Sequence, residues 1–296
     1  MDIQFFDSEK IYQDAERKGL FDMGDNLLLY EDIGFSHKWI QPPVACYFLC
    51  TEDGKGNANM APISMGTAVW GEPPDACWYY TFGVQNSRQT MENINLNQEC
   101  VLSYFPAGLI KESAISALPI PRGISELEVC KLTELPSKKV KPSGVRECPV
   151  NLEAVIINQV QVSNTTIFVA KIVGVSVWKQ FIEADKAHPY HPGVFLTDLL
   201  FEVSITHEGS TKLNYSKMNL DQVFRPQDDL GDKNHWVGNF SLWLESELER
   251  GRITPDEYSQ LLQLNQKWLE NPDPITNLTV KKALTQLICD MIWRDI

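Results

Sequence analysis

Two short stretches of the chain carry residue types that suit the binding of a phosphorylated, flat ligand. The first is Asn86-Ser87-Arg88-Gln89-Thr90, which stands where a helix running towards Asn97 is expected to begin, capped by Asn86 or Ser87. A helix N-terminus offers unpaired N–H groups and the positive end of the helix dipole, so it can bind an anion. Hydroxyl groups and a guanidinium in the first turn add donors for phosphate. Taken alone, the stretch fits an ordinary capped helix with an exposed arginine better than a phosphate site.

The second stretch, from Asn59 to Thr67, places small and polar residues inside an otherwise apolar strand. It runs Asn-Met-Ala-Pro-Ile-Ser-Met-Gly-Thr. Small residues let backbone N–H and C=O groups approach a flat ligand closely. The same residues also fit a bulge at the rim of a barrel, which requires no ligand.

The elements around these stretches are predicted to be strands with tight connections. Compact apolar runs separated by turn signals are typical of strands, and a run rich in aromatic residues suits a pleated surface. Strands in this order, with a single helix among them, favour an antiparallel barrel over an alternating β-α-β fold. The expected strands are Val44–Cys50, Met60–Trp70, Ala76–Phe82, Cys100–Phe105, Asn151–Val162, Thr166–Trp178 and Leu199–Ile205.

The segments outside these strands are predicted to be loops and helices. Residues 106–149 are rich in loops and are expected to hold two short helices, and a further short helix is expected at Asp7–Lys18. Thr254-Pro255-Asp256-Glu257 is a capping box with proline at the first helical position, and it predicts a helix that ends near Glu270. A last helix is expected after Thr276 or Asn277, with one buried stripe formed by Leu284, Leu287, Ile288 and Met291.

Composition excludes several classes of protein. The formal net charge of -13 argues against a nucleic-acid partner, because phosphate contacts require clustered Lys and Arg. The N-terminus does not resemble a secretory signal, and no run approaches the roughly 18 apolar residues that a membrane helix requires. Seven cysteines without a Cys-x-x-Cys pair predict free, buried thiols rather than a metal site. We therefore expect a cytoplasmic protein without a membrane partner.

Together the two stretches and the strands around them resemble the flavin reductase-like FMN-binding proteins, which include flavoredoxins and the small components of two-component monooxygenases. The family's order of motifs can be followed from residue 40 to 178. It consists of the turn Asp53-Gly54, the run Asn59-Met60-Ala61-Pro62-Ile63-Ser64, the turn Pro73-Pro74, the run Arg88-Gln89-Thr90-Met91-Glu92-Asn93-Ile94, and the pairs Leu132-Thr133, Pro136-Ser137 and Glu147-Cys148-Pro149 with Leu152-Glu153.

This resemblance implies a mainly β fold, a six-stranded FMN-binding split β-barrel with a helical C-terminal extension. It divides the chain into a lead-in (1–38), the barrel domain (39–205) and a linker with C-terminal helices (206–296). It also implies a homodimer with the flavin near the subunit interface, for which an unpaired edge and a large apolar face give a physical reason. The implied FMN-binding residues are Asn59, Ala61, Pro62, Ser64, Met65, Gly66, Thr67, Ser87, Arg88 and Thr90. Of these, Ser64 to Thr67 would contact the isoalloxazine edge and ribityl chain, and Ser87, Arg88 and Thr90 would hold the phosphate.

The chain departs from the family pattern at the position tied to nicotinamide use. Many NADH-using members carry Gly-Asp-His before a strand of the type Thr-Ile-Phe-Val-Gly-Glu-Val. Here Ser163-Asn164-Thr165 precedes the strand, so Thr165 replaces the histidine and Lys171 replaces the acidic residue. The change leaves FMN binding untouched but weakens the expectation that NADH reduces the flavin.

Other candidate chemistry is less specific. His188 and His191 stand in a proline-rich loop, which fits a plain surface loop better than a lid over the flavin, and a metal site least of all. His235 either lies against a flavin or merely packs. Neither a nucleophile–base motif nor a Gly-x-Gly-x-x-Gly signature is present, so no catalytic residue is assigned and any nicotinamide would bind transiently over the flavin.

Three functions follow in order of preference. The first is an FMN-dependent oxidoreductase that passes hydride from NAD(P)H to the flavin, with the protein positioning and tuning the cofactor. The second is a carrier of electrons with tightly bound FMN, or a flavoprotein that acts on one metabolite without nicotinamide. The third is a barrel that has lost its flavin and serves as an interaction module.

Overall fold

The computed structural model describes most of the central and C-terminal parts of the chain. The described residues are 21–22, 27–28, 44–72, 77–179, 194–196, 199–205, 211–217, 239–270 and 274–294. The helix predicted at Asp7–Lys18 and the histidines His188, His191 and His235 lie outside these residues.

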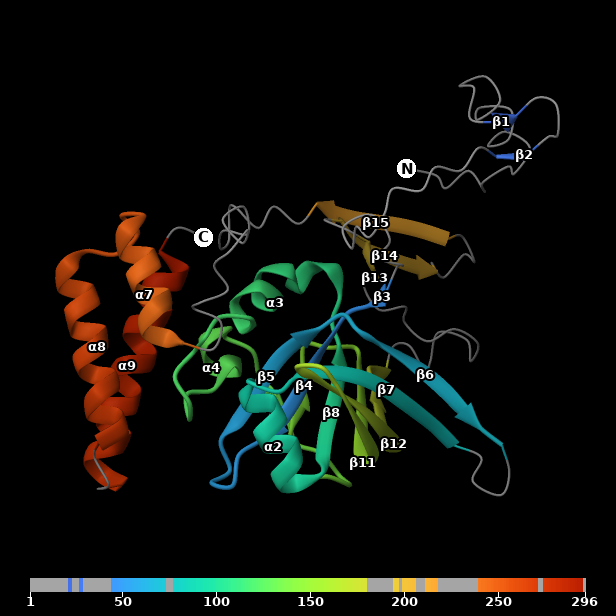
Figure 1. The fold of residues 1–296 in the computed structure, drawn as a ribbon, viewed down its shortest axis with the longest axis horizontal. Coiled ribbons are helices and arrows are strands. Elements are labelled where there is room, and N and C mark those ends of the chain that lie inside the picture. The colour runs from blue at the N-terminus through green and yellow to red at the C-terminus, as the bar shows by residue number, and fades with distance from the viewer. Residues whose placement is uncertain are drawn as a thin grey trace.

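One large antiparallel sheet forms the centre of the molecule, with its strands in the order β5-β4-β8-β11-β12-β7-β6. β5 and β6 stand at opposite edges although only Ser64 and Met65 separate them in the chain. The two edges therefore lie side by side at that point, and the sheet rolls into the predicted barrel (Figure 1). The strands are β4 (Tyr47–Glu52), β5 (Ala58–Ile63), β6 (Gly66–Gly71), β7 (Cys77–Gln85), β8 (Glu99–Tyr104), β11 (Val150–Val162) and β12 (Thr165–Val177).

A bend divides the run that was predicted as one strand from Met60 to Trp70, so the sheet has seven strands where six were expected. The hydroxyl of Tyr47 in β4 donates to the backbone O of Met65 at 3.2 Å. A Cβ atom on Gly66 would lie 2.6 Å from the backbone O of Thr81. Only glycine therefore lets the chain leave the bend this close to β7.

Strand β4 is buried on both faces and separates two apolar cores. Tyr47 and Leu49 point into the barrel, and Phe48 and Cys50 point out of it, as the two-residue period of a strand requires. The barrel core also contains Tyr80, Phe82, Val84, Ile94, Leu102, Ala154, Phe168 and Ala170. The outer core also contains Met60, Ile115, Leu127, Val129, Trp243, Leu244, Leu261, Leu284 and Ile288.

Residues 106–149 cover the outside of β4 and β5, and they contain the two short helices that the sequence predicts. These are α3 (Ile110–Ser116) and α4 (Glu126–Val129), preceded by the 3-10 turn η1 (Ala107–Leu109) and followed by the strand pair β9 (Glu134–Leu135) and β10 (Gly144–Val145). The helix after β7 is α2 (Gln89–Asn97). The predicted strand Leu199–Ile205 is β14.

A second sheet has the order β15-β14-β13-β3 and pairs the start of the barrel region with a later part of the chain. Its strands are β3 (Val44–Ala45), β13 (Val194–Leu196), β14 and β15 (Thr211–Lys217). The sequence did not predict β15, which pairs with β14 across the domain boundary expected after residue 205. A separate pair, β1 (Phe21–Asp22) and β2 (Leu27–Leu28), precedes the barrel.

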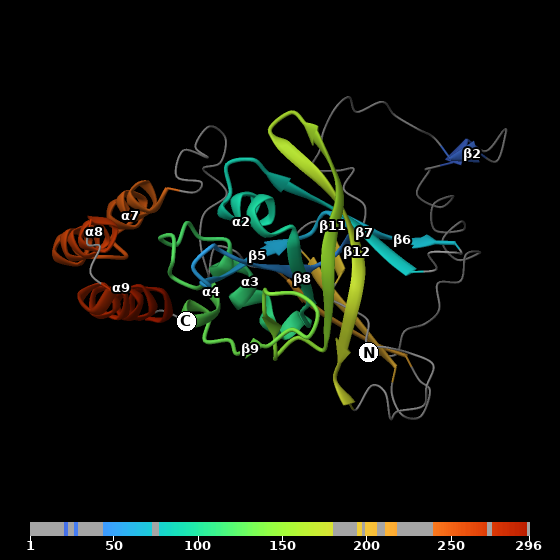
Figure 2. The same cartoon turned by 90° about the horizontal axis from the view of Figure 1, so that it is seen from below.

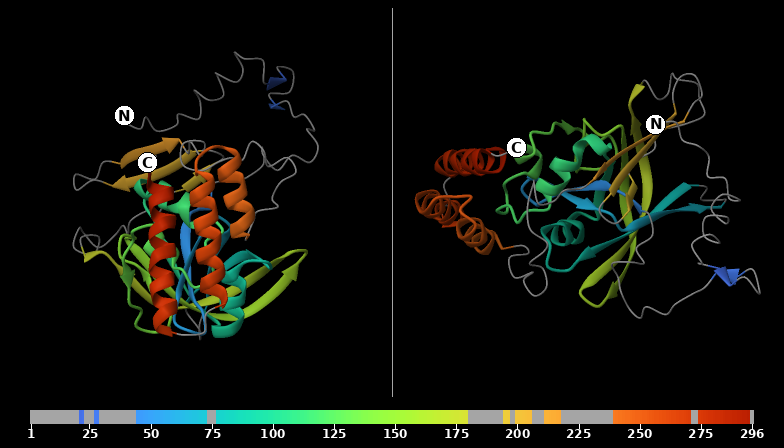
Figure 3. Two further views of the ribbon diagram at one scale, coloured as in Figure 1. Left: turned by 90° about the vertical axis from the view of Figure 1, so that its left-hand side faces the viewer. Right: turned by 90° about the horizontal axis from the view of Figure 1, so that it is seen from above.

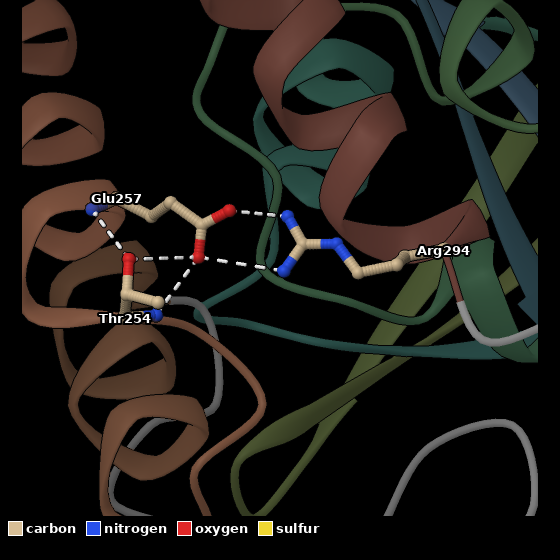
Figure 4. Close-up of polar contacts among 3 residues, drawn as sticks. All are labelled: Thr254, Glu257 and Arg294. Carbon is tan, nitrogen blue, oxygen red and sulfur yellow. Dashed lines mark hydrogen bonds and ion pairs between the residues drawn. The ribbon is translucent and has the colours of Figure 1, made fainter.

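The described residues of the C-terminal extension after β15 form the helices α7 (Phe240–Glu249), α8 (Pro255–Glu270) and α9 (Pro274–Trp293). The predicted capping box at the start of α8 is confirmed (Figure 4). Thr254 Oγ1 accepts from the N–H of Glu257 at 3.2 Å, and Glu257 Oε2 accepts from the N–H of Thr254 at 2.8 Å. Arg294, after α9, pairs with the same carboxylate, and its hydrogen bond lowers the pKa of Glu257 to about 2.

The last helix begins at Pro274, earlier than predicted, because proline suits the first helical position. Its predicted stripe is confirmed, since Leu284 and Ile288 are fully buried and Leu287 and Met291 pack against them. α7 was not predicted, although Asn239 caps it by accepting from the N–H of Leu242.

The C-terminal helices lie beside α3 and α4 at one end of the molecule (Figures 1 and 2). The indole N–H of Trp293 donates to the backbone O of Val129 at 2.8 Å, and that of Trp268 donates to the backbone O of Arg122 at 2.9 Å. Figure 3 shows α7, α8 and α9 in front of the barrel when it is viewed from this end. The extension and residues 106–149 thus share the outer core with the barrel.

The opposite side of the barrel is formed by β6, β7, β11 and β12 (Figure 2). Several of its apolar side chains are exposed. Trp70 and Trp78 face each other across β6 and β7 with ring centroids 5.0 Å apart, and about half of each side chain is exposed. Val160 and Ile167 form another exposed pair, on β11 and β12 and on the opposite face of the sheet from Trp70 and Trp78. Within the described part of the chain, no helix is long and apolar enough to cross a membrane.

Candidate functional site

A cavity of about 260 Å³ lies between β5, the end of β7, the start of α2 and residues 116–122. It brings together residues from both stretches that the sequence singled out. Of the predicted site residues, Asn59, Ala61, Pro62, Met65, Ser87, Arg88 and Thr90 line it. Ser64, Gly66 and Thr67 are not part of its lining and lie at the adjoining bend between β5 and β6.

The start of α2 differs from the prediction that Asn86 or Ser87 caps it. The cap residue is Arg88, whose backbone is extended and whose side chain makes no cap hydrogen bond. β7 continues as far as Gln85. Asn86 instead forms hydrogen bonds with the turn between β11 and β12 and with the start of β12. Its N–H donates to the backbone O of Asn164 at 2.8 Å, and its Oδ1 accepts from the hydroxyl of Thr166. The uncapped N-terminus of α2 therefore opens onto the cavity, as Gln89 and Thr90 also line it.

Arg88 supplies the positive charge at this end of the cavity. Its Nε donates to Oε1 of Gln85 at 3.2 Å, which holds the side chain beside the end of β7. Burial lowers the pKa of its guanidinium from the ordinary value, because a half-buried cation lacks part of its hydration. An anion in the cavity would restore favourable electrostatic interactions to this group.

Thr90 and Asn59 belong to a buried hydrogen-bonded cluster under the cavity. The side-chain amide of Asn59 donates to the hydroxyl oxygens of Thr51 and Thr90 at 3.2 and 3.1 Å. Asn93 donates to the same oxygen of Thr51 at 3.1 Å. Because the oxygen of Thr90 accepts from Asn59, its own proton is available for a ligand in the cavity. Asn59 thus orients Thr90 as well as lining the cavity itself.

Glu126 is a cavity residue that the sequence did not single out. Its carboxylate is buried, and Oε2 accepts from the N–H of Met60 at 2.9 Å. Burial raises the pKa of Glu126 to about 7, and the hydrogen bond from Met60 offsets only part of that rise. The residue lies in a short helix 66 positions from its partner, so no local pattern could reveal the contact.

Residues 116–122 form a wall of the cavity that was also missed. Its apolar part is Leu118, Pro119 and Ile120, and its end is Arg122. The guanidinium of Arg122 makes a bidentate ion pair with Glu92 of α2, with 2.7 Å between Nη2 and Oε1. This pair ties the wall to the helix whose N-terminus faces the cavity.

Thr165, the position that departs from the family pattern, lies next to the cavity. It pairs with Gln85 across β12 and β7, and Gln85 and Gly83 both line the cavity. The hydroxyl of Thr165 donates to Oδ1 of Asn164 at 3.4 Å. Lys171 pairs with Tyr79, further along the same strands.

No set of three or more metal-binding side chains occurs among the described residues. The seven cysteines are all described, and all are free thiols as predicted. Burial raises the pKa of Cys50 to about 12 and raises those of Cys100, Cys130 and Cys148 as well, so these thiols are protonated at neutral pH.

Comparison with known proteins identifies relatives of the barrel. Residues 43–195 match the model of the flavin reductase like domain. Flavoredoxin of Desulfovibrio vulgaris (Miyazaki F) has a similar fold, with a TM-score of 0.51 and 15% identity over 69% of this chain and 100% of that chain. Nitrilotriacetate monooxygenase component B from Bacillus cereus aligns with 18% identity over 64% of this chain and 95% of that chain, with a TM-score of 0.48. The C-terminal helices lie outside the matched residues.

Proposed function

This chain belongs to the flavin reductase-like family, and we propose that it is an FMN-binding oxidoreductase that takes hydride from NAD(P)H. The observation that carries the proposal is the convergence of two separate stretches on one cavity. Asn59, Ala61 and Pro62 come from β5, and Arg88 and Thr90 come from the start of α2. FMN is a flat ring joined to a phosphate by a short chain, which matches this division of the site.

The donors at the α2 end suit a phosphate dianion. Arg88 contributes a half-buried positive charge, Ser87 and Thr90 contribute hydroxyl groups, and the uncapped first turn of α2 contributes N–H groups. The buried side-chain amide of Asn59 donates to the hydroxyl oxygen of Thr90. This hydrogen bond orients the hydroxyl group, so that the proton of Thr90 is available to the phosphate. These groups bind and orient the cofactor.

The ring and ribityl chain would lie along β5 and the bend that follows it. Ala61 and Pro62 present little side-chain bulk, and Ser64, Met65, Gly66 and Thr67 form the bend at its open end. Tyr47 fixes that bend through its hydrogen bond to Met65. When bound, FMN supplies the chemistry of accepting a hydride, and the residues of the chain position it and exclude water.

The position of Thr165 favours a second candidate, a flavoprotein that keeps its FMN and does not use nicotinamide. Thr165 stands beside Gln85 at the cavity, where NADH-using members of the family carry a histidine. Threonine cannot provide the aromatic, titratable contact of an imidazole. The donor is therefore the part of the proposal that experiment must decide first.

The decisive measurement is the absorbance of the FMN-loaded protein mixed with NADH or NADPH without oxygen. Loss of flavin absorbance with either donor supports the oxidoreductase. Retained yellow colour with both donors selects the carrier or metabolite-specific flavoprotein. A protein that fails to bind FMN would refute both and leave an interaction module.

The phosphate site itself is tested by Arg88→Gln. Loss of one charge-assisted hydrogen bond of about 1.5–3 kcal/mol should weaken FMN binding roughly 10- to 100-fold. Arg146→Gln, which removes the same charge from an exposed residue, is the matched control and should bind FMN normally. Equal affinities of the two variants, measured by quenching of flavin fluorescence, would show that Arg88 does not hold the phosphate.

A further inference from the structure

Among the described residues that line the cavity, Glu126 alone is acidic. It lies at the start of α4, and only 8% of its surface is exposed. Its Oε2 accepts from the N–H of Met60 at 2.9 Å, and within the described part of the chain no other residue donates to the carboxyl. One carboxyl oxygen is therefore anchored to β5, and the other remains for a ligand in the cavity.

The bond from Met60 places Glu126 beside the proposed phosphate site. Met60 follows Asn59, whose side-chain amide donates to Oγ1 of Thr90 at 3.1 Å. Thr90 and Arg88 line the same cavity at the start of α2. With a volume of about 260 Å³, the cavity is small enough for the charges of its lining and of a ligand to interact strongly. An ionised Glu126 would therefore repel a phosphate bound there.

The two arginines of the lining have other partners. Arg88 donates to Oε1 of Gln85 at 3.2 Å, and Arg122 forms its bidentate ion pair with Glu92. No salt bridge to Glu126 occurs within the described residues. Since no positive charge stabilises its ionised form, burial favours the neutral acid and raises the pKa of Glu126 to about 7.

The other titratable groups around Glu126 do not supply a positive charge either. α4 packs against β5, α3 and α9, and β5 carries no titratable side chain. The thiols of Cys50 and Cys130 interact electrostatically with Glu126, but burial raises the pKa of both, so they stay protonated at neutral pH. Glu112 of α3 and Cys289 of α9 act on Cys130 in turn. We therefore expect a change of pH near neutrality to act on the cavity through Glu126.

We propose that Glu126 binds the flavin phosphate as a neutral acid, donating its O–H to a phosphate oxygen while Oε2 keeps its bond from Met60. The inference rests on the proposed FMN site and adds a residue and a proton to it. Glu126 and the phosphate share one proton, because a carboxylate and a phosphate dianion in one small cavity would repel each other. An O–H donor makes a short and strong hydrogen bond to an anionic oxygen.

The expected dependence on pH follows from the two titrating partners. Below about pH 6 the phosphate takes up its second proton, so affinity for FMN falls on acidification. Above about pH 7 Glu126 of the free protein loses its proton, so each FMN that binds must take one up from water. Affinity then falls by about tenfold per pH unit. Riboflavin, which lacks the phosphate, should bind equally well across this range.

The test measures the dissociation constants of FMN and riboflavin for the full chain at about pH 6.5 and about pH 8.5, by quenching of flavin fluorescence. The constant for FMN should rise roughly tenfold or more at the higher pH, and the constant for riboflavin should not change. Calorimetric titration at about pH 8, in two buffers of different ionisation enthalpy, should find an uptake of about one proton per FMN bound.

Two matched variants assign the effect to Glu126. Glu126→Gln keeps an acceptor for Met60 and a donor for the phosphate but cannot ionise, so its affinity for FMN should hold at the higher pH and its proton uptake should vanish. Glu128→Gln removes the same charge from an exposed position of the same helix and should keep the wild-type dependence on pH. Normal riboflavin binding by each variant checks that the cavity is intact.

The other outcomes separate this proposal from the proposed function. A wild-type affinity for FMN that is equal at the two pH values, or a Glu126→Gln variant that keeps the wild-type dependence, would overturn the role of Glu126 and leave the FMN site standing. An equal fall in riboflavin affinity would place the contact away from the phosphate and overturn the proposal too. Failure of the wild type to bind either flavin at the lower pH would instead overturn the proposed function itself.

Discussion

The two outer sides of the barrel differ in what covers them. On the side of β4, Phe48 and Cys50 are fully buried under residues 106–149 and the C-terminal helices. On the side of β6, β7, β11 and β12, Trp70 and Val160 are about half exposed. Both sides have apolar side chains outside the barrel core, but within the described part of the chain only the side of β4 has a cover.

This difference shows that the C-terminal helices belong to the folded core. The outer core joins α7, α8 and α9 to β4 and β5 in one continuous apolar cluster, so removal of the helices would expose it to water. The uncovered side has the properties of a surface that meets another molecule. We propose a second copy of the chain as its cover, as the sequence led us to expect.

The largest contrast should come from equivalent truncations on the two sides. Phe48→Ala should lower the free energy of unfolding by about 3–5 kcal/mol, because it leaves a cavity in the outer core. Trp70→Ala, on a half-exposed side chain, should cost the isolated subunit much less. Urea unfolding of both variants at low protein concentration checks the contrast, and similar losses would contradict it.

A second prediction concerns Glu126, on the covered side of the barrel. Because the pKa of Glu126 is raised to about 7, the folded state favours the neutral acid, and this contribution to stability is complete below the unfolded pKa near 4.5. This contribution is lost as the pH rises from about 4.5 to about 7. The loss amounts to roughly 2–4 kcal/mol of the free energy of unfolding. Glu126→Gln keeps the acceptor for Met60 and cannot ionise. The stability of the wild type relative to this variant should therefore fall between pH 4.5 and 7. A constant difference across that range would show that Glu126 titrates normally.

The uncovered side is tested by placing a charge on it. Trp70→Glu should prevent dimer formation, because truncation or charging of a central interface tryptophan commonly costs about 2 kcal/mol or more of binding free energy. The melting temperature of the subunit should change little, since the side chain is half exposed. Sedimentation velocity measures the dimer, and Lys282→Gln, on the far side, is the control. A wild-type protein that stays monomeric at high concentration would show that a second copy of the chain does not cover this side.

The smallest effect on stability is expected at Trp268 of α8, which contacts the wall of the cavity at Arg122. Trp268→Phe keeps an aromatic ring at this position but removes the N–H that donates to the backbone O of Arg122. Loss of this hydrogen bond should cost about 0.5–1.5 kcal/mol of stability. Urea unfolding measures it, with Trp178→Phe, which removes a comparable bond to the backbone O of Arg146 and does not involve the C-terminal helices, as the matched control. A loss well above that range would mean that the ring itself, and not only the bond, holds the wall.

Local features of the chain were predictable because their partners are close in sequence. Thr254 and Glu257 cap α8 through bonds that span three residues, and the capping box was recognised from those residues alone. The alternation along β4 and the stripe on α9 likewise follow from the period of a single element. The family motifs also marked both stretches that line the cavity, from Asn59 and from Arg88.

Features that depend on distant residues were missed or predicted wrongly. Asn86 does not cap α2 because it is bound to Thr166, 80 positions away. Glu126 lines the cavity and accepts from the N–H of Met60, 66 positions away. Trp268 donates to the backbone O of Arg122 in the cavity wall, across 146 positions. The sequence by itself determined the strands, the capped helix and the two stretches that line the cavity. Only the tertiary structure decided which residues complete the site, because a side chain's partner depends on how separate elements pack and not on its neighbours in the chain.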